Sequence, residues 1–242
     1  MEEHDKHRAA AMTPYDRYSL QQSPLRNDLL RNPETLYQSM AFDVSIIRAL
    51  GSLQVDVQSA EILDVGCGNG GSVLNFLRLG CKPSSIYGID RLGERIEEAR
   101  GRFPNVNFSC GDASAMMYPD ARFDIVFEST MFIQMTDQEL ASRVAKEMLR
   151  VLKPQGYILL VDWRYSKPGN SEYLGLSKKR IKALFECGSQ TTICRTFRGA
   201  LVPPVGRSLS KHAPSLYSLV QLTCPVLVGQ QTTVLKKDQV SL

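Results

Sequence analysis

A glycine-rich segment preceded by an acid is the part of this sequence best suited to bind a nucleotide-like ligand. Residues 64–71 read D-V-G-C-G-N-G-G and continue an apolar run that begins at Ile62. A glycine-rich turn between a strand and a helix lets the backbone approach a ligand and exposes N–H groups at the start of the helix. The segment fits the dinucleotide pattern G-x-G-x-x-G from Gly66 and also the pattern D-x-G-x-G-x-G from Asp64. The glycines alone therefore leave the ligand open.

The carboxylate of Asp64 favours a cationic ligand over a diphosphate. A dinucleotide would bring two negative charges to this turn, where an acid two residues before the first glycine opposes them. S-adenosylmethionine carries a sulfonium and an ammonium but no phosphate, and both cations favour a nearby carboxylate. Asp90 suits a ribose diol in either case, because a carboxylate can accept two O–H hydrogen bonds. A nicotinamide-dependent dehydrogenase remains the less favoured alternative.

The elements around this segment follow a regular alternation of strands and helices. The predicted strands are 62–65, 85–90, 106–110, 123–127 and 157–162, and the predicted helices between them are 72–79, 92–102 and about 137–152. Short apolar strands that alternate with helices indicate a parallel sheet covered on both faces, with ligands bound beyond the carboxyl ends of the strands. Each strand reaches an acid at that edge: Asp64, Asp90, Asp112, Glu128 and Asp162. We therefore expect one ligand site along this edge.

The two ends of the chain depart from this alternation. Residues 1–33 are polar and contain three prolines, which predicts an N-terminal arm or lid before a domain over 34–242. Asn32 and Pro33 predict the start of a helix that ends near Gly51. The apolar stripe expected on that helix is Leu36, Met40, Phe42, Val44, Ile47 and Leu50. Beyond residue 164 we expect a helix over 177–187, two strands at 191–202 and 231–237, and an insert over 203–228 with a helix at 215–222.

Five motifs in the expected order resemble those of class I S-adenosylmethionine-dependent methyltransferases, over about residues 34–165. They are Ile62–Gly70, Tyr87–Asp90, Cys110–Ala113, Phe123–Glu128 and Met148–Gly156. The most similar subgroup is the broad one that includes quinone-biosynthesis and small-molecule methylases. The resemblance implies a three-layer α/β/α Rossmann-like fold, with a mostly parallel seven-stranded sheet that ends in an antiparallel hairpin. It also implies S-adenosylmethionine as the cofactor.

Carried over residue by residue, the resemblance assigns the donor site to the glycine loop and the strand ends. The implied cofactor-binding residues are Asp64, Gly66, Cys67, Gly68, Asn69, Asp90, Arg91, Asp112, Ala113 and Glu128. Asp90 would take the ribose hydroxyls and Arg91 would lie over the adenine. Asp112 would accept from the adenine amino group, the Ala113 amide would face a ring nitrogen, and Glu128 would line the methionine end. The segment 128–134 lacks the histidines often found after the fourth strand, which puts a catalytic role there in doubt.

Three residues are candidates for a general base. Methyl transfer from a sulfonium is an in-line displacement, in which the enzyme chiefly aligns the nucleophile and excludes water. A hydroxyl nucleophile needs a base, whereas a preionised one does not. His212 lies in the insert, where the acceptor should bind, and an unperturbed histidine titrates near neutral pH. A surface or helix-end role is the alternative for His212, and Glu128 and Asp162 are the other candidates because they end strands near the expected methyl group.

The charge distribution bears on the acceptor. Residues 164–242 carry twelve Lys and Arg against three Asp and Glu, whereas the first 163 residues carry 17 against 22. A positive C-terminal part favours a negatively charged acceptor or surface. We expect O-methylation of a small-molecule or glycan acceptor, anionic or lipid-linked. Nucleic-acid methylation is the alternative, with phosphates on Lys178, Lys179, Arg180, Lys182, Arg195 and Arg198. The apolar insert residues could form a membrane-facing patch or pack into the core: Leu216, Tyr217, Leu219, Val220, Leu222, Val226 and Leu227.

Composition gives weaker indications about location and metals. The six cysteines are scattered without a C-x-x-C pair, which predicts reduced thiols and neither a disulfide framework nor a zinc site. No apolar run reaches membrane-spanning length, and the charged segment 1–8 lacks the apolar part of a secretory signal. We therefore expect a cytoplasmic protein without a metal, in which membrane contact would be peripheral. The sequence does not indicate the oligomeric state.

Overall fold

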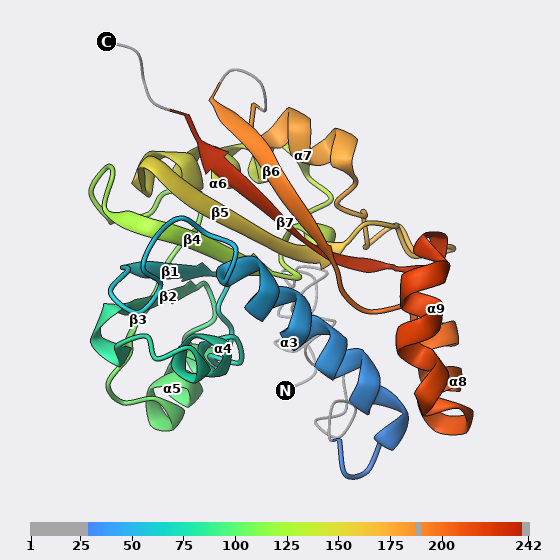
Figure 1. Ribbon diagram of the computed structural model, residues 1–242. Helices are drawn as coiled ribbons and strands as arrows, with labels where there is room; N and C mark the ends of the chain where they lie inside the picture. The colour runs from blue at the N-terminus through green and yellow to red at the C-terminus, as the bar shows by residue number, and fades with distance from the viewer. Residues whose placement is uncertain (1–28, 187–189, 239–242) are drawn as a thin grey trace, which may run out of the picture.

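The computed structural model describes residues 29–186 and 190–238 (Figure 1). Residues 1–28 of the predicted arm lie outside the described part of the chain. The strands are β1 (Ile62–Val65), β2 (Ile86–Asp90), β3 (Asn107–Cys110), β4 (Phe123–Ser129), β5 (Leu152–Trp163), β6 (Thr191–Arg198) and β7 (Gln230–Lys237). They form one sheet in the order β3-β2-β1-β4-β5-β7-β6, in which β1 to β5 run parallel and β7 pairs antiparallel with both β5 and β6. The expected mostly parallel sheet with a C-terminal antiparallel hairpin is confirmed.

Helices cover both faces of this sheet (Figure 1). The α-helices are α3 (Leu36–Leu50), α4 (Val73–Arg78), α5 (Gly93–Arg102), α6 (Gln138–Val151), α7 (Lys178–Leu184), α8 (Pro203–His212) and α9 (Tyr217–Thr223). Short 3-10 turns occur at η1 (Pro33–Thr35), η2 (Pro83–Ser85), η3 (Phe132–Gln134), η4 (Pro214–Leu216) and η5 (Pro225–Leu227). One core cluster lies between the sheet and α6 and α7, and a second lies between the sheet and α3, α4 and α5.

The segment predicted as an insert folds into two helices that pack beside α3. Helix α8 begins at Pro203-Pro204, because proline is tolerated in the first turn of a helix. The helix expected over 215–222 is confirmed as α9, displaced by one or two residues. Tyr217 fixes α9 in place: its side chain is buried, its hydroxyl accepts a hydrogen bond from the Leu201 amide at 3.1 Å, and its ring lies 5.8 Å from that of Tyr37.

The buried face of α3 differs from the predicted stripe. Leu36, Met40 and Val44 are 37%, 51% and 44% exposed, and small residues of the helix, such as Ala41 and Ser45, face the protein interior instead. Small side chains bring the helix close to the sheet, where the Ser45 hydroxyl lies 2.8 Å from that of Thr232 on β7. The predicted start is confirmed, since η1 begins at Pro33 with Asn32 at its N-cap position, but the cap differs in kind. The side chain of Asn32 does not cap the helix, and it is the Asn32 carbonyl that accepts from the Thr35 amide and hydroxyl.

Candidate active site

The glycine loop after β1 adopts a backbone that only glycine takes readily. Gly66, Gly68 and Gly70 have φ of 72°, 53° and 79°, in the left-handed region that a Cβ disfavours. Gly71 is not among the glycines with positive φ, and a Cβ placed there would meet nothing within 4 Å. The third position at which the backbone requires glycine is therefore Gly70. The loop follows the pattern D-x-G-x-G-x-G in its backbone conformation, whereas it matches the dinucleotide pattern in sequence only.

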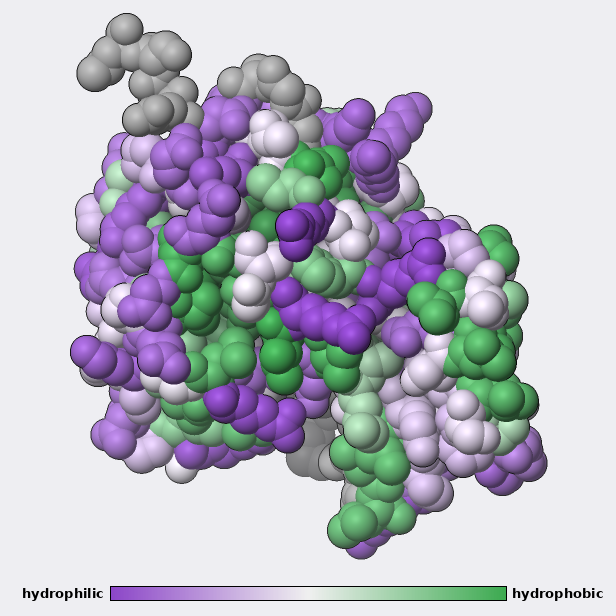
Figure 2. Space-filling view, in the orientation of Figure 1, coloured by the Kyte–Doolittle hydropathy of each residue, from purple (hydrophilic) through white to green (hydrophobic). Residues whose placement is uncertain are grey.

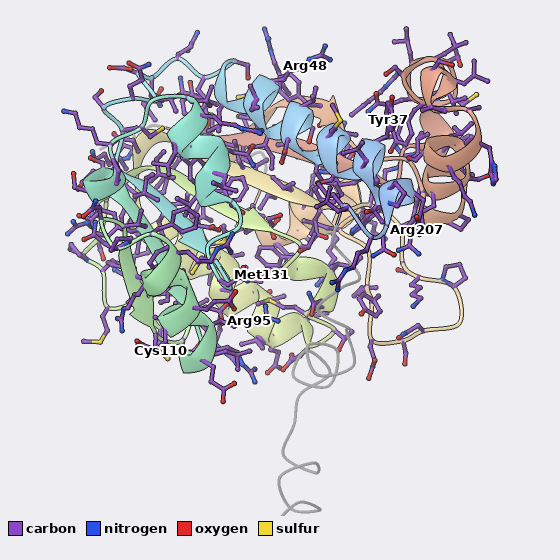
Figure 3. The ribbon with its side chains drawn as sticks, turned by 90° about the horizontal axis from the view of Figure 1, so that it is seen from below. Tyr37, Arg48, Arg95, Cys110, Met131 and Arg207 are labelled. Atoms are coloured by element: carbon purple, nitrogen blue, oxygen red, sulfur yellow. The ribbon has the colours of Figure 1, made fainter. Side chains whose placement is uncertain are left out.

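Two side chains that the sequence did not suggest flank this loop. A Cβ on Gly66 would lie 2.9 Å from the Met131 sulfur, and one on Gly68 would lie 3.4 Å from an Arg95 guanidinium nitrogen. Figure 3 shows Met131 and Arg95 near each other on this side of the molecule. Met131 follows β4, and Glu128 of β4 is in register with Val65 of β1, so the topology brings it to the loop. The sequence could have suggested Met131, because it lies three residues after Glu128, an acid predicted at the end of a strand.

Asp64 is a buried carboxylate whose oxygens are not satisfied. Its side chain is 1% exposed, and neither oxygen makes a hydrogen bond of normal geometry. Burial raises the pKa of Asp64 to about 8, repulsion from Asp90 adds to this rise, and the nearby Ser72 hydroxyl acts weakly in the opposite direction. A buried carboxylate without a partner costs free energy unless a cation or a donor reaches it. The base of the glycine loop is thus prepared for a positively charged group.

Asp90 closes the loop onto β2. One of its oxygens accepts from the Gly68 amide at 2.9 Å, and the other accepts from the Leu92 amide at 2.9 Å. Each oxygen keeps a lone pair, so the carboxylate is held in place and can still accept from a diol. The carbonyl of Asp90 accepts from the Gly111 amide, which sets the loop after β3 beside it. Asp112, in that loop, accepts from the Ser114 amide at 2.8 Å.

The remaining predicted cofactor residues lie around the same edge of the sheet. Cys67 is buried in the loop, where burial raises the pKa of its thiol. The side chain of Asn69 turns away to donate to Glu98 on α5 at 2.8 Å. Arg91 is exposed after β2, and Ala113 is half-buried against the core.

Glu128 and Asp162 form a buried pair of acids at the ends of β4 and β5. Their side chains are 0% and 2% exposed, and strand alternation puts both on the face covered by α6 and α7. Asp162 accepts from the Trp163 and Ile133 amides at 2.7 and 2.8 Å. Glu128 accepts from the Met131 amide through Oε2, whereas its Oε1 has no partner. Burial raises the pKa of Asp162 to about 7, and burial followed by repulsion from Asp162 raises that of Glu128 well above its usual range.

Arg180 of α7 interacts electrostatically with this pair of acids and holds the turn η3 in place. Its guanidinium donates to the carbonyls of Phe132, Leu174 and Met135 at 3.0, 2.7 and 2.6 Å. The sequence placed Arg180 on the exposed side of its helix, which is wrong: the residue is 9% exposed. It lies four residues before the buried Leu184, on the same face of the helix, and that helical spacing was the signal that could have found it. One of the six cations that the nucleic-acid alternative needs is therefore not on the surface.

Comparison with known proteins decides between the ligands that such a loop could take. Residues 62–156 match the family described as "Methyltransferase domain". Residues 62–156 form a class I methyltransferase domain. Solved structures support the fold: the chain is similar to a SAM-dependent methyltransferase from Methanosarcina mazei (TM-score 0.53, 21% identity, 76% of this chain and 94% of that one) and to an S-adenosylmethionine dependent methyltransferase from Mesorhizobium loti (0.57, 14%, 83% and 99%). The expected family and its cofactor, S-adenosylmethionine, are confirmed.

Relatives with curated names are also methyltransferases. The fatty-acid O-methyltransferase of Mycolicibacterium smegmatis is 35% identical over 181 residues, which is 72% of this chain and 59% of that protein. The 2-methyl-6-phytyl-1,4-hydroquinone methyltransferase of Synechocystis is 33% identical over 118 residues, 47% of this chain and 35% of that protein. A phthiotriol/phenolphthiotriol dimycocerosates methyltransferase of Mycobacterium ulcerans is 32% identical over 117 residues, 46% and 41%. The chain thus spans 59% or less of these relatives' length. The quinone-biosynthesis subgroup remains a prediction.

The geometry of the methyltransferase domain fits this donor. The unsatisfied Asp64 carboxylate suits the cationic methionine part, and the three left-handed glycines leave room for the donor against the backbone. Asp90 and the loop that carries Asp112 and Ala113 lie at the edge where the nucleoside would be held. Individual contacts of these residues with the donor remain predictions.

The structure does not bring His212 to the acid pair. His212 is exposed at the C-terminal end of α8, and α8 packs against α3 and η1, whereas Glu128 and Asp162 face α6 and α7. Its role as a base stays a prediction. Within 29–186 and 190–238, no three His, Cys, Asp or Glu side chains are arranged to hold a metal ion, and no helix combines the length and apolar composition needed to cross a bilayer.

Proposed function

We propose that the chain transfers the methyl group of S-adenosylmethionine to an oxygen atom of a lipid-like small-molecule acceptor. The observation that carries this proposal is the buried, partnerless carboxylate of Asp64 under the glycine loop, since it calls for a cationic ligand. The names of the relatives favour an acceptor of this kind, because they specify a fatty acid, dimycocerosates and a phytyl hydroquinone.

The acid pair supplies a proton acceptor when the nucleophile is a hydroxyl. Burial raises the pKa of both carboxyls, that of Asp162 to about 7, and repulsion from Asp162 adds to the rise at Glu128. A base with a pKa near the working pH is the most effective. We assign the acceptor's proton to Glu128 Oε1, the oxygen of the pair without a hydrogen-bond partner. An acceptor that arrives as a carboxylate needs no base, and the domain then has only to orient it and exclude water.

The donor assignment is tested by calorimetry. The purified chain is titrated with S-adenosylmethionine, S-adenosylhomocysteine and NADH, and we expect binding of the first two only. Binding of NADH without the sulfonium compound would overturn the proposal.

The acceptor assignment is tested with a methyl-labelled donor and acceptors that carry a carboxylate, an alcohol or a hydroquinone. Label incorporated as a methyl ester is released as methanol by mild alkali, whereas label in an ether is stable. Label on carbon or nitrogen, with none on oxygen, would contradict O-methylation.

We further propose that α9 and η5 contact an anionic lipid surface from which the acceptor is taken. Leu216, Leu219, Leu222 and Val226 are 46%, 54%, 69% and 68% exposed, and residues 213–235 contain no charged side chain. These four residues are named the α9 ridge here, and Figure 2 shows a hydrophobic area over α9. The exposed cations Lys211 and Arg198 flank it, and Arg198 donates to the Leu222 carbonyl at the end of the helix. Apolar residues with a basic border suit the interface of an anionic bilayer.

A further inference from the structure

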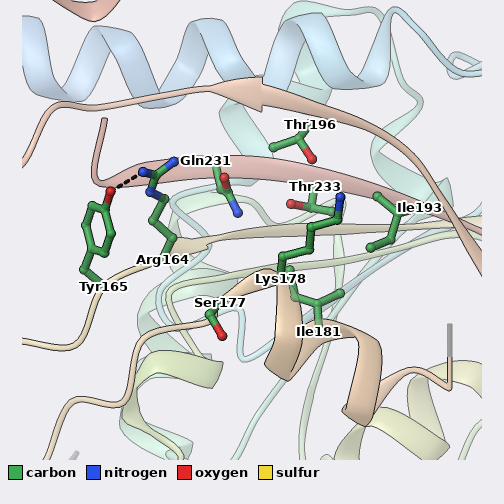
Figure 4. Close-up of a pocket in the computed structure, with 9 residues that line it drawn as sticks. All are labelled: Arg164, Tyr165, Ser177, Lys178, Ile181, Ile193, Thr196, Gln231 and Thr233. Carbon is green, nitrogen blue, oxygen red and sulfur yellow. Dashed lines mark hydrogen bonds between the residues drawn. The ribbon is translucent and has the colours of Figure 1, made fainter. Parts of the chain in front are cut away.

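A cavity of about 390 Å³ opens between α7 and the antiparallel strands β6 and β7, near the end of β5 (Figure 4). It lies beside the acid pair. Gln231, which lines the cavity, is the partner of Asp162 in the β5–β7 register, and Thr233, which also lines it, is the partner of Leu160. Leu160 is in turn paired with Glu128 on β4. A ligand in this cavity is therefore one or two strands away from the acids.

The walls of the cavity carry positive charge only. Arg164 and Lys178 line it, and none of the lining residues is an acid. Lys178 makes no ion pair or hydrogen bond with a described residue, and Figure 4 shows its side chain extending from α7 toward β7. The guanidinium of Arg164 lies 4.5 Å from the centre of the Tyr165 ring and donates to the Tyr165 hydroxyl, which leaves further N–H donors for a ligand. Two cations without a carboxylate between them favour an anion.

Thr233 provides an independent sign of a ligand. Its side chain is 2% exposed, and its Oγ1 has no hydrogen-bond partner although it borders the cavity. A buried hydroxyl without a partner destabilises the fold. Valine would have the same shape without this cost. The Thr233 hydroxyl would gain a hydrogen bond if a ligand filled the cavity.

We propose that this cavity binds the carboxylate or phosphate group of an amphiphilic acceptor, with Lys178 and Arg164 as counter-charges and the Thr233 hydroxyl as a donor. Ile181 and Ile193, on opposite walls, would cover the first carbons of the ligand's apolar chain. The assignment of this ligand as the acceptor rests on the proposed function, but binding of the anion does not. Lys178 and Arg164 are positioning residues here.

The first test measures binding without a methyl donor. Laurate, dodecyl phosphate and dodecanol, each below its micellar concentration or solubility limit, are titrated into the full chain and into Lys178→Gln. We expect at least one anion to bind more tightly than dodecanol, and Lys178→Gln to weaken that anion roughly tenfold while dodecanol is unchanged. The matched control is Lys179→Gln, since Lys179 is exposed on the same helix but does not line the cavity. Preference for laurate or for dodecyl phosphate identifies the anion. Equal binding of all three ligands, or equal effects of the two lysine variants, would overturn the proposal.

The second test uses Thr233→Val, because a ligand site and a packing defect respond differently to this change. If the hydroxyl serves the ligand, the variant should bind the anion about two- to fivefold more weakly and unfold at a Tm about 2–4 °C higher. Unchanged affinity would mean that the hydroxyl does not face the ligand. Titration of the same proteins with S-adenosylmethionine separates the proposed function from the proposed anion site. If the wild-type chain did not bind the donor, the proposed function would be contradicted and the anion result would stand.

Discussion

At the scale of single residues, Asp64 is the proposed partner of the donor's positive charge. Replacing Asp64 with asparagine keeps the shape of the side chain but removes the negative charge at the base of the glycine loop. We expect Asp64→Asn to weaken S-adenosylmethionine by more than about tenfold, since a charge-assisted contact in a buried site is lost. Calorimetry also shows whether a proton is released. With a pKa of about 8 in the free chain, Asp64 is mostly protonated at neutral pH, and a bound cation lowers that pKa. The wild-type enthalpy should therefore vary with the ionisation enthalpy of the buffer, and that of Asp64→Asn should not.

The same residue predicts a pH dependence of stability. Its folded pKa of about 8 lies above the ordinary 3.8, so the folded chain holds a proton that the unfolded chain releases. The folded state therefore loses stability as the pH rises from about 4 through 8. Asparagine does not titrate, so Asp64→Asn should unfold at a higher temperature than the wild type at pH 9, and the difference should shrink toward pH 5. Thermal unfolding at these two pH values, without ligand, checks this. A constant difference would mean that Asp64 is not the titrating group.

At the scale of elements, Arg180 connects α7 to the turn after β4. Replacing it with methionine, which is similar in length, removes the hydrogen bonds to Phe132, Leu174 and Met135 and leaves the acid pair without a cation. We expect a loss of about 3–5 kcal/mol in the free energy of unfolding, as for other buried charges that lose a partner. Because Arg180 lowers the pKa of Asp162, the pH profile of methyl transfer should move to higher pH.

The control for this change lies on the same helix. Lys182 is exposed, and Lys182→Gln should alter stability by less than about 0.5 kcal/mol and leave the pH profile where it is. If Arg180→Met lowered stability without moving the pH profile, Arg180 would be structural only.

The elements also show what the sequence could and could not predict. The parallel strands were predictable because each is a short apolar run closed by an acid, and the glycine loop was predictable because its spacing dictates its backbone. The buried face of α3 was not predictable, because small residues such as Ala41 bring the helix close to the sheet and leave Met40 exposed. The cavity beside α7 was not predictable either. Its walls come from four segments, between residues 164 and 233, that meet only through the pairing of β7 with β5 and β6.

At the scale of the whole molecule, charge and apolar surface are concentrated in the C-terminal part. All of the excess positive charge lies in residues 164–242, and the α9 ridge lies in the same part of the chain. An apolar ridge beside cations should partition to a bilayer only where the lipid charge is negative, because each contribution alone is weak. Co-sedimentation should therefore detect binding to phosphatidylcholine vesicles that contain phosphatidylglycerol, and much less to phosphatidylcholine alone. Salt at about 0.5 M should reduce it, since screening then acts over a few ångströms.

The variant that tests this surface is Leu219→Glu/Leu222→Glu, which puts two charges on the most accessible part of α9. Its binding to the anionic vesicles should be at least roughly tenfold weaker, since two leucines lose their burial and the two new acids are repelled by the anionic lipids. Leu74→Glu is the matched control, because Leu74 is 49% exposed on α4, away from the ridge, and its change should leave vesicle binding unaltered. Binding of S-adenosylmethionine by all three proteins verifies that each is folded. If the double variant and the control bound vesicles equally, the ridge would not be the lipid contact, and the acceptor would have to reach the acid pair from solution.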